Sequence, residues 1–202
     1  MHSKGVTFLT RAGCQDGGYG QRGRNWISPY GNMFLTACFI EPQKFSPGKL
    51  SISIGVLLAK IIQSFLPNQR IELKWPNDLL LNRKKCGGVI IEVEEDIHIG
   101  IGINIATHPE NTNTPATHLG DFCKIDINAL LIKIIENIEN YLKNPLVFDD
   151  IRRTWWSFAK DSIPFWHLRE PINGNIIGID EQGYLLIESE QGQVTKRYSA
   201  FQ

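Results

Sequence analysis

Apolar side chains recur along this chain with two different periods, and each period predicts a kind of element. Three- and four-residue spacing predicts helices over 47–66, 126–142 and 149–160, with Asp126 as the expected N-cap of the second. Short apolar or alternating runs, rich in β-branched and aromatic residues, predict strands. These runs cover 6–10, 32–40, 70–75, 88–94, 98–105, 175–179, 184–187 and 193–198. A tight turn at 82–84 is expected after 79–81, and a surface loop at 107–117.

This order of elements predicts an α+β fold. We expect a mixed β-sheet with helices packed on it over residues 1–162, and a small β-barrel-like module over 163–202. A chain of 202 residues with 42% hydrophobic positions is long and apolar enough for one main domain and such an appendage.

Charge and cysteine usage narrow the function classes. Lys plus Arg and Asp plus Glu total 21 each, so the chain lacks the basic excess that favours nucleic-acid binding. The four cysteines and five histidines show no metal-ligand spacing, and we expect neither a disulfide framework nor a histidine or cysteine metal site. Without a signal peptide or a run of about 18 apolar residues, a cytoplasmic protein that does not enter a membrane is expected.

The segment 13–31 is a long loop with six glycines. Residues 18–23 match GxGxxG, but Pro29 and Gly31 argue against the helix that a dinucleotide site requires. Glycine N–H groups together with Arg22 and Arg24 would suit an anion clamp. A solvated turn whose arginines face water is the alternative.

A second group of polar residues follows strand ends. The sequence Lys-Trp-Pro-Asn-Asp at 74–78 is followed by Lys85, two glycines and a predicted strand, and the next strand carries Gly100, Gly102 and Asn104. Glycines at these positions would expose backbone to a ligand. Two ordinary hairpins would explain each piece singly, but together the pieces predict a ligand-binding sheet face.

These blocks resemble the biotin protein ligase family, which carries a GRGRxGRxW loop, KWPND, a lysine before a glycine-containing strand and a G-x-G-I-N strand. The matching stretches are 18–26, 74–78, 85–92 and 100–104, and the resemblance continues into 178–183. It implies a class II synthetase-like biotin/lipoate ligase fold with an SH3-like C-terminal barrel. It also implies ATP-dependent formation of biotinyl-AMP, with Mg²⁺, and transfer of biotin to a lysine of a carrier domain.

The resemblance assigns roles to single residues. Lys85, Arg24 and Asp78 are the expected catalytic residues, and Asp78 is the expected Mg²⁺ ligand. Biotin is expected to contact Gln15, Gly18, Tyr19, Lys85, Gly87 and Gly102. ATP is expected to contact Gln21, Arg22, Arg24, Trp26, Asn77 and Asn104.

The sequence also departs from the family pattern. Tyr19 and Gln21 replace arginines, and Gln21 lacks the charge that would hold an adenylate phosphate, so looser retention of the adenylate is expected. The Ser/Thr-Thr-Asn segment that precedes the first strand in relatives is expected to be missing. Either the sequence is truncated at its start, or the site is incomplete. The helix-turn-helix domain of some relatives is also expected to be missing, and DNA regulation is not expected.

The expected partner is the biotin carboxyl carrier domain of acetyl-CoA carboxylase or a related carboxylase. Exposed strand edges could pair with that domain or with a second copy, giving a homodimer. Two other functions are weighed against the ligase: a catalytically impaired module that binds biotin or carrier, and a lipoate-type ligase.

Overall fold

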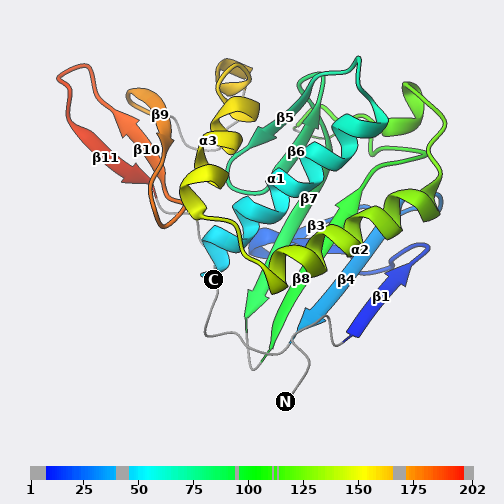
Figure 1. Ribbon diagram of the computed structural model, residues 1–202. Helices are drawn as coiled ribbons and strands as arrows, with labels where there is room; N and C mark the ends of the chain where they lie inside the picture. Colours follow the sequence, from blue (N-terminus) through cyan, green and yellow to red (C-terminus); the bar gives the residue numbers. More distant parts are fainter. Residues whose placement is uncertain are drawn as a thin grey trace.

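A six-stranded sheet, covered by helices on one face, forms the centre of the molecule (Figure 1). The computed structural model describes residues 8–39, 46–93, 96–110, 112, 114–165 and 172–197. The strand order is β1-β4-β8-β7-β6-β5, with antiparallel pairs throughout and one parallel bridge between Lys85 and Ala116. The strands are β1 (Phe8–Ala12), β4 (Met33–Phe39), β5 (Ile71–Lys74), β6 (Asp78–Leu81), β7 (Lys84–Val93) and β8 (Ile97–Ile103).

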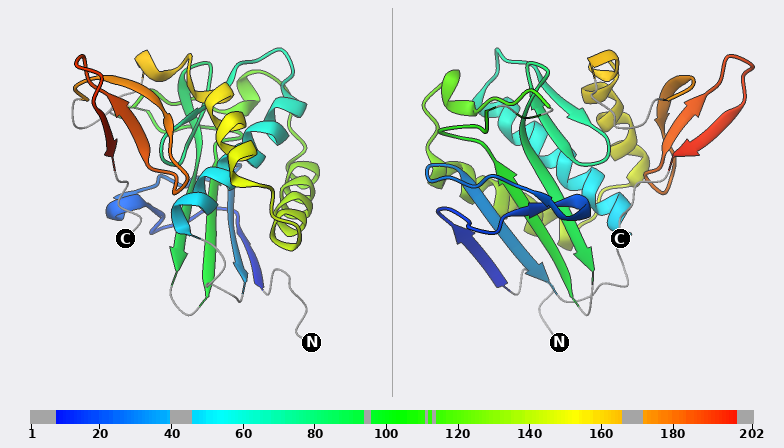
Figure 2. Two further views of the ribbon diagram at one scale, coloured as in Figure 1. Left: turned by 60° about the vertical axis from the view of Figure 1, so that its left-hand side comes forward. Right: turned by 180° about the vertical axis from the view of Figure 1, so that it is seen from behind.

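Three helices lie together on one face of this sheet, as Figures 1 and 2 show. They are α1 (Pro47–Phe65), α2 (Ile127–Lys143) and α3 (Phe148–Ala159). The sequence predicted all three to within a residue or two, and Asp126 caps α2 as expected, accepting hydrogen bonds from the backbone N–H groups of Asn128 and Ala129. The predicted α+β class is confirmed.

The sequence of strand β8 explains why helices cover only one face of the sheet. Its isoleucines alternate with smaller or polar residues, and every isoleucine is buried under the helices. Side chains on a strand point to opposite faces in turn, so His98, Gly100 and Gly102 face the other side. The second face of β8 therefore exposes glycine backbone, whereas the side chains of the first face pack into the hydrophobic core.

The helix α1 also meets the length and hydropathy expected of a membrane span, although the sequence analysis found no such run. Of its most apolar 18-residue window, 61% is buried inside the protein. A core helix passes the same test, and α1 packs against β5, β6 and β7. The observation is weak support for a membrane span.

The C-terminal part forms a three-stranded antiparallel sheet in the order β11-β10-β9 (Figure 1). Its strands are β9 (Asn175–Ile179), β10 (Leu185–Glu188) and β11 (Val194–Arg197). Two hydrogen bonds fix it to the main domain: Trp75 Nε1 donates to the carbonyl of Gly183 at 3.0 Å, and Arg152 Nε donates to that of Ile179 at 2.9 Å. The proposed boundary between residues 162 and 163 stays a prediction.

Most strand boundaries lie within two residues of the expectations, and two differences bear on the site or on the limits of the described chain. The first strand was predicted over 6–10; β1 extends to Ala12, and positions 6 and 7 lie outside the described residues. Strand β7 begins at Lys84 instead of 88, because β6 pairs with it from Lys84 onward. Lys85 consequently lies within a strand of the sheet.

Candidate active site

The glycine-rich loop folds across the open face of the sheet (Figure 2). A two-stranded ribbon, β2 (Tyr19–Gly20) with β3 (Arg24–Asn25), forms its tip around a single 3₁₀ turn. Arg22 in that turn has φ of 60°, a left-handed conformation uncommon outside glycine. The Trp26 N–H donates to the Gly18 carbonyl at 2.8 Å and closes the ribbon. We call residues 13–31 the flap.

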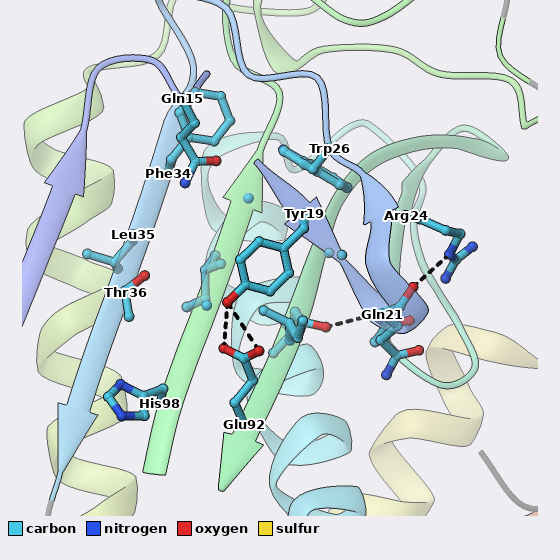
Figure 3. A pocket seen from close by; sticks show the side chains of 18 of the residues that line it. Gln15, Tyr19, Gln21, Arg24, Trp26, Phe34, Leu35, Thr36, Glu92 and His98 are labelled. Carbon is cyan, nitrogen blue, oxygen red and sulfur yellow. Dashed lines mark hydrogen bonds between the residues drawn. The ribbon is translucent and has the colours of Figure 1, made fainter. Parts of the chain in front are cut away.

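A pocket of about 380 Å³ lies between the flap and the sheet. From the flap, five predicted site residues line it: Gln15, Tyr19, Gln21, Arg24 and Trp26. From the sheet, Asn77, Lys85 and Gly102 line it. Residues far apart in the sequence and assigned to biotin or ATP by resemblance therefore surround one cavity, most of whose flap side chains are labelled in Figure 3.

The side of the pocket formed by the sheet is built from the glycines of β7 and β8, and we call it the floor. Gly102 pairs with Gly88, so both face the cavity. The indole of Trp26 lies directly on them: a Cβ at position 102 would be 2.7 Å from its ring, and one at 88 would be 3.6 Å away. Trp26 Nε1 is buried and has no hydrogen-bond partner among the described residues. A buried donor without a partner is costly, so a ligand can displace this indole from the floor at little cost in free energy.

Cationic groups gather at one end of the floor. Lys85 Nζ lies 2.5 Å from Asp78 Oδ1 and 5.1 Å from the centre of the Trp26 ring. Lys74 is buried close by, and this desolvation lowers its pKa; Asp78 opposes the shift, while Lys85 and Arg24 add to it. Three positive charges beside a single carboxylate leave an excess that an anion would neutralise.

The other end of the pocket is polar without excess positive charge. The Tyr19 hydroxyl donates to the Glu92 carboxylate, at 3.1 and 3.0 Å from its two oxygens. Figure 3 shows this contact, with Thr36 and His98 farther along the neighbouring strands. Tyr19 thus connects the flap to β7 at the position where the family carries an arginine.

The remaining predicted site residues lie outside the cavity lining. Gly18 packs inside the flap, where a Cβ would be 2.5 Å from Ser28 Oγ. Gly87 pairs with Leu79 and Ile103, which places it on the helix-covered face; Gly88 takes the cavity position instead. Arg22 is exposed at the tip of the flap.

Asp78 and Asn104 also lie outside the lining. Asp78 is paired with Gly88, and its Oδ1 would be 3.8 Å from a Cβ there, so the carboxylate adjoins the floor. Asn104 is buried, and its side-chain amide donates to the Thr117 carbonyl at 3.1 Å. Asn104 therefore orders the segment that follows β8 in this structure. Its expected contact with the nucleotide stays a prediction.

Sequence reasoning placed Gly88 and Gly100 on a ligand-binding sheet face, but it missed other residues that line the cavity, among them Thr36, Glu92 and His98. The period-two alternation of β8 could have identified His98, since it shares a face with Gly100 and Gly102. Glu92 and Thr36 depend on strand register, because their places follow from the pairing of β7 and β4 with β8. A bulge also interrupts the pairing of β6 with β7 next to Lys85, and no local pattern in the sequence marks it.

The fold is similar to that of solved biotin protein ligases. The structure titled "Biotin protein ligase from Aquifex aeolicus in complex with biotin and ATP" matches with a TM-score of 0.78 and 25% identity, over 95% of this chain and 85% of that one. A Leishmania major biotin protein ligase in complex with biotin matches in fold, with a TM-score of 0.71 at 22% identity, over 95% of this chain and 88% of that one. The fold is thus that of the biotin protein ligase class.

Family models and curated relatives agree with this class. Residues 2–105, just over half of the chain, match the Biotin/lipoate A/B protein ligase family, and 168–202 match the Biotin protein ligase C terminal domain. The chain belongs to the biotin/lipoate protein ligase family. The "Bifunctional ligase/repressor BirA" of Bacillus spizizenii is 30% identical over 95% of this chain, which spans 64% of that relative's length. The "Biotin--[acetyl-CoA-carboxylase] ligase" of Mycobacterium tuberculosis is 25% identical over 86% of this chain and 70% of its own length.

Proposed function

We propose that this protein is a biotin protein ligase. In the first step a carboxylate oxygen of biotin attacks the α-phosphorus of ATP, forming biotinyl-AMP and releasing pyrophosphate. In the second step a lysine amine of a carrier domain attacks the carbonyl of this mixed anhydride, forming an amide and releasing AMP. The observation that carries the proposal is the glycine floor with the ammonium of Lys85 at its end, beneath the flap.

The charge distribution supports the first step. Joining a carboxylate to a phosphate brings two anions together, and fixed cations that lower this repulsion favour the transition state. Lys85 lines the cavity and Arg24 enters it from the flap. Lys74 is buried beside them, so its field acts in a setting of low polarity. A hydrophobic pocket without these cations would bind the ring of biotin but would not align its carboxylate for attack.

Asp78 fits the role of a Mg²⁺ ligand. Its Oδ1 is buried, and its close partner among the described residues is the Lys85 ammonium, at 2.5 Å. A buried carboxylate oxygen with spare acceptor capacity suits a hard cation. When bound, Mg²⁺ would neutralise phosphate charge. Lys85 would then exchange its contact with Asp78 for the reacting anions.

The flap suits the protection of a reactive intermediate. A mixed anhydride hydrolyses in water, and a closed loop excludes water from it. Trp26 already covers the floor glycines. We infer that substrate displaces this indole, which then packs against the bound nucleotide, with the Tyr19 to Glu92 contact holding the flap near β7.

The acceptor in this proposal is the biotin carboxyl carrier domain of a carboxylase, in the cytoplasm, where ATP is available. Its support is the Mycobacterium tuberculosis relative, which is named as a biotin–[acetyl-CoA-carboxylase] ligase. The matched family also covers lipoate ligases, so the choice of acid has to be tested directly.

The test uses the purified full chain with ATP, Mg²⁺ and either labelled biotin or labelled lipoate, with and without a biotin carrier domain. We expect label in an acyl-adenylate and then on the carrier with biotin alone, together with one pyrophosphate released for each adenylate. Incorporation of lipoate instead of biotin would show that the protein is a lipoate ligase. Biotin binding without pyrophosphate release would overturn the ligase assignment and identify a binding module.

A further inference from the structure

A cluster of three potential metal ligands lies outside the pocket, in the segment that follows β8. His108 and His118 face each other with their Nδ1 atoms 2.8 Å apart, and His118 Nε2 lies 3.3 Å from Asp121 Oδ1. One ligand atom from each residue can be chosen so that all three lie within 4.8 Å of one another. Spacing in the sequence did not reveal this group, because 10 residues separate the two histidines.

The chemistry of this donor set favours a borderline transition-metal ion. Two imidazoles and a carboxylate are the ligands that Zn²⁺ takes at sites with three protein ligands. Tetrahedral coordination requires ligand atoms about 3.4 Å apart, given metal–nitrogen bonds of about 2.0–2.1 Å. If both Nδ1 atoms are ligands, they need to separate by roughly half an ångström, and Asp121, which contacts Nε2 of His118, has to move toward the Nδ1 side.

The surroundings contact these side chains. The Thr117 hydroxyl donates to Asp121 Oδ2 at 3.3 Å, an outer contact of the kind that orients a ligating carboxylate. The His118 side chain is 18% exposed and that of Asp121 is 47% exposed, so the group is open to an entering ion. The ring centroids of His108 and His118 lie 5.1 Å apart, tilted by 30°.

The cluster is connected to the catalytic strand through backbone hydrogen bonds. The Lys85 N–H donates to the Pro115 carbonyl at 2.8 Å, and the Thr117 N–H donates to the Lys85 carbonyl at 3.0 Å. A link between His108 and His118 would close the segment that makes these contacts, and so reduce its freedom beside Lys85.

We propose that His108, His118 and Asp121 form a binding site for Zn²⁺ or a similar divalent transition-metal ion, which holds residues 114–121 against the strand of Lys85. This site is separate from the Mg²⁺ proposed at Asp78, because imidazole ligands favour transition metals over Mg²⁺. The proposal does not depend on the ligase reaction.

The experiment measures Zn²⁺ binding to the full chain, prepared without a histidine tag, by titration calorimetry in the absence of biotin and ATP. We expect one ion per chain, with at least roughly tenfold weaker binding in His108→Ala and in Asp121→Asn. His98→Ala is the matched control: it removes a half-buried histidine outside the cluster and should leave the isotherm unchanged. Circular dichroism verifies that each variant is folded.

Two further readouts make the result decisive. Co²⁺ in place of Zn²⁺ should give the visible absorption of a tetrahedral site in the wild type and in His98→Ala, but not in His108→Ala. Hydrogen exchange at the N–H groups of Lys85 and Thr117 should slow when Zn²⁺ is added. Equal Zn²⁺ affinity in wild type and His108→Ala, or loss of binding in His98→Ala, would overturn the proposal.

Discussion

The floor and the flap of the pocket are built in opposite ways. The floor lies on strands of ten and seven residues, paired along their length and backed by buried isoleucines. The flap tip has strands of two residues each and no buried residue in its turn. Regions with few buried contacts open at low free-energy cost, whereas a fully paired sheet opens only with global unfolding.

This difference assigns separate tasks to the two walls. The floor holds Lys85 and Asp78 in fixed positions before substrate arrives, as preorganised electrostatic catalysis requires. The flap admits and covers the substrates, which requires movement. Substitutions in the floor should therefore affect the chemical step or the shape of the site, and those in the flap should affect retention and closure.

The largest expected effect comes from Lys85→Ala in the floor. Removal of this ammonium leaves the carboxylate and phosphate unneutralised, so biotin-dependent pyrophosphate release should fall by roughly a hundredfold or more. Lys84→Ala is the control, because it removes a neighbouring exposed lysine and should retain full activity. Equal rates in the two variants would assign no catalytic role to Lys85.

Gly102→Ala tests the shape of the floor. Its Cβ would lie 2.7 Å from the Trp26 ring and would occupy space above the sheet, so the KM for biotin or ATP should rise by about tenfold. Gly88→Ala makes only an ordinary 3.6 Å contact with the same ring, and its effect should be smaller. Steady-state kinetics with each substrate varied in turn would measure both. A larger effect at position 88 would contradict the proposed geometry.

The floor could be anticipated from the sequence far better than the pocket as a whole. Alternation in β8 predicts a buried isoleucine face and an open glycine face, because strand period alone fixes these sides. The bulge in the pairing of β6 with β7 is a tertiary feature, and it lies between Gly87 and Lys85. Tyr19 meets Glu92 only after the flap folds over β7, and no local pattern encodes that contact.

The histidine cluster illustrates the same limit. Spacing rules recognise ligands that lie close together in sequence on one element, such as one face of a helix. His108 and His118 meet because the intervening segment turns back at the Lys85 strand, through the Ala116 bridge. The sequence-based expectation of no histidine or cysteine metal site stays a prediction, which Zn²⁺ binding at this cluster would contradict.

Gln21→Arg tests retention by the flap. A guanidinium at this cavity-lining position would add a charged donor for the adenylate phosphate. Release of free biotinyl-AMP into solution should then fall by roughly threefold to fivefold. Gln21→Glu should change it in the opposite direction, since a carboxylate repels phosphate. Equal leakage from all three proteins, measured by chromatography without carrier, would refute this role.

The smallest expected effect is that of Tyr19→Phe, which removes the hydroxyl that donates to Glu92. A hydrogen bond at a partly exposed site contributes modestly, so adenylate retention should weaken by roughly twofold to fivefold. Glu92→Gln keeps an acceptor oxygen for the Tyr19 hydroxyl, so this variant should retain the adenylate nearly as well as the wild type. The double variant Tyr19→Phe with Glu92→Ala should be no worse than Glu92→Ala alone. Additive losses would indicate that the two residues act independently.

A crystal structure with a non-hydrolysable biotinyl-adenylate analogue tests the central claim most directly. The account predicts density along Gly88, Gly100 and Gly102, with the Lys85 ammonium at the acyl-phosphate linkage and the Trp26 indole displaced from the floor. An analogue bound away from these glycines, or a Lys85 side chain turned out of the cavity, would contradict it.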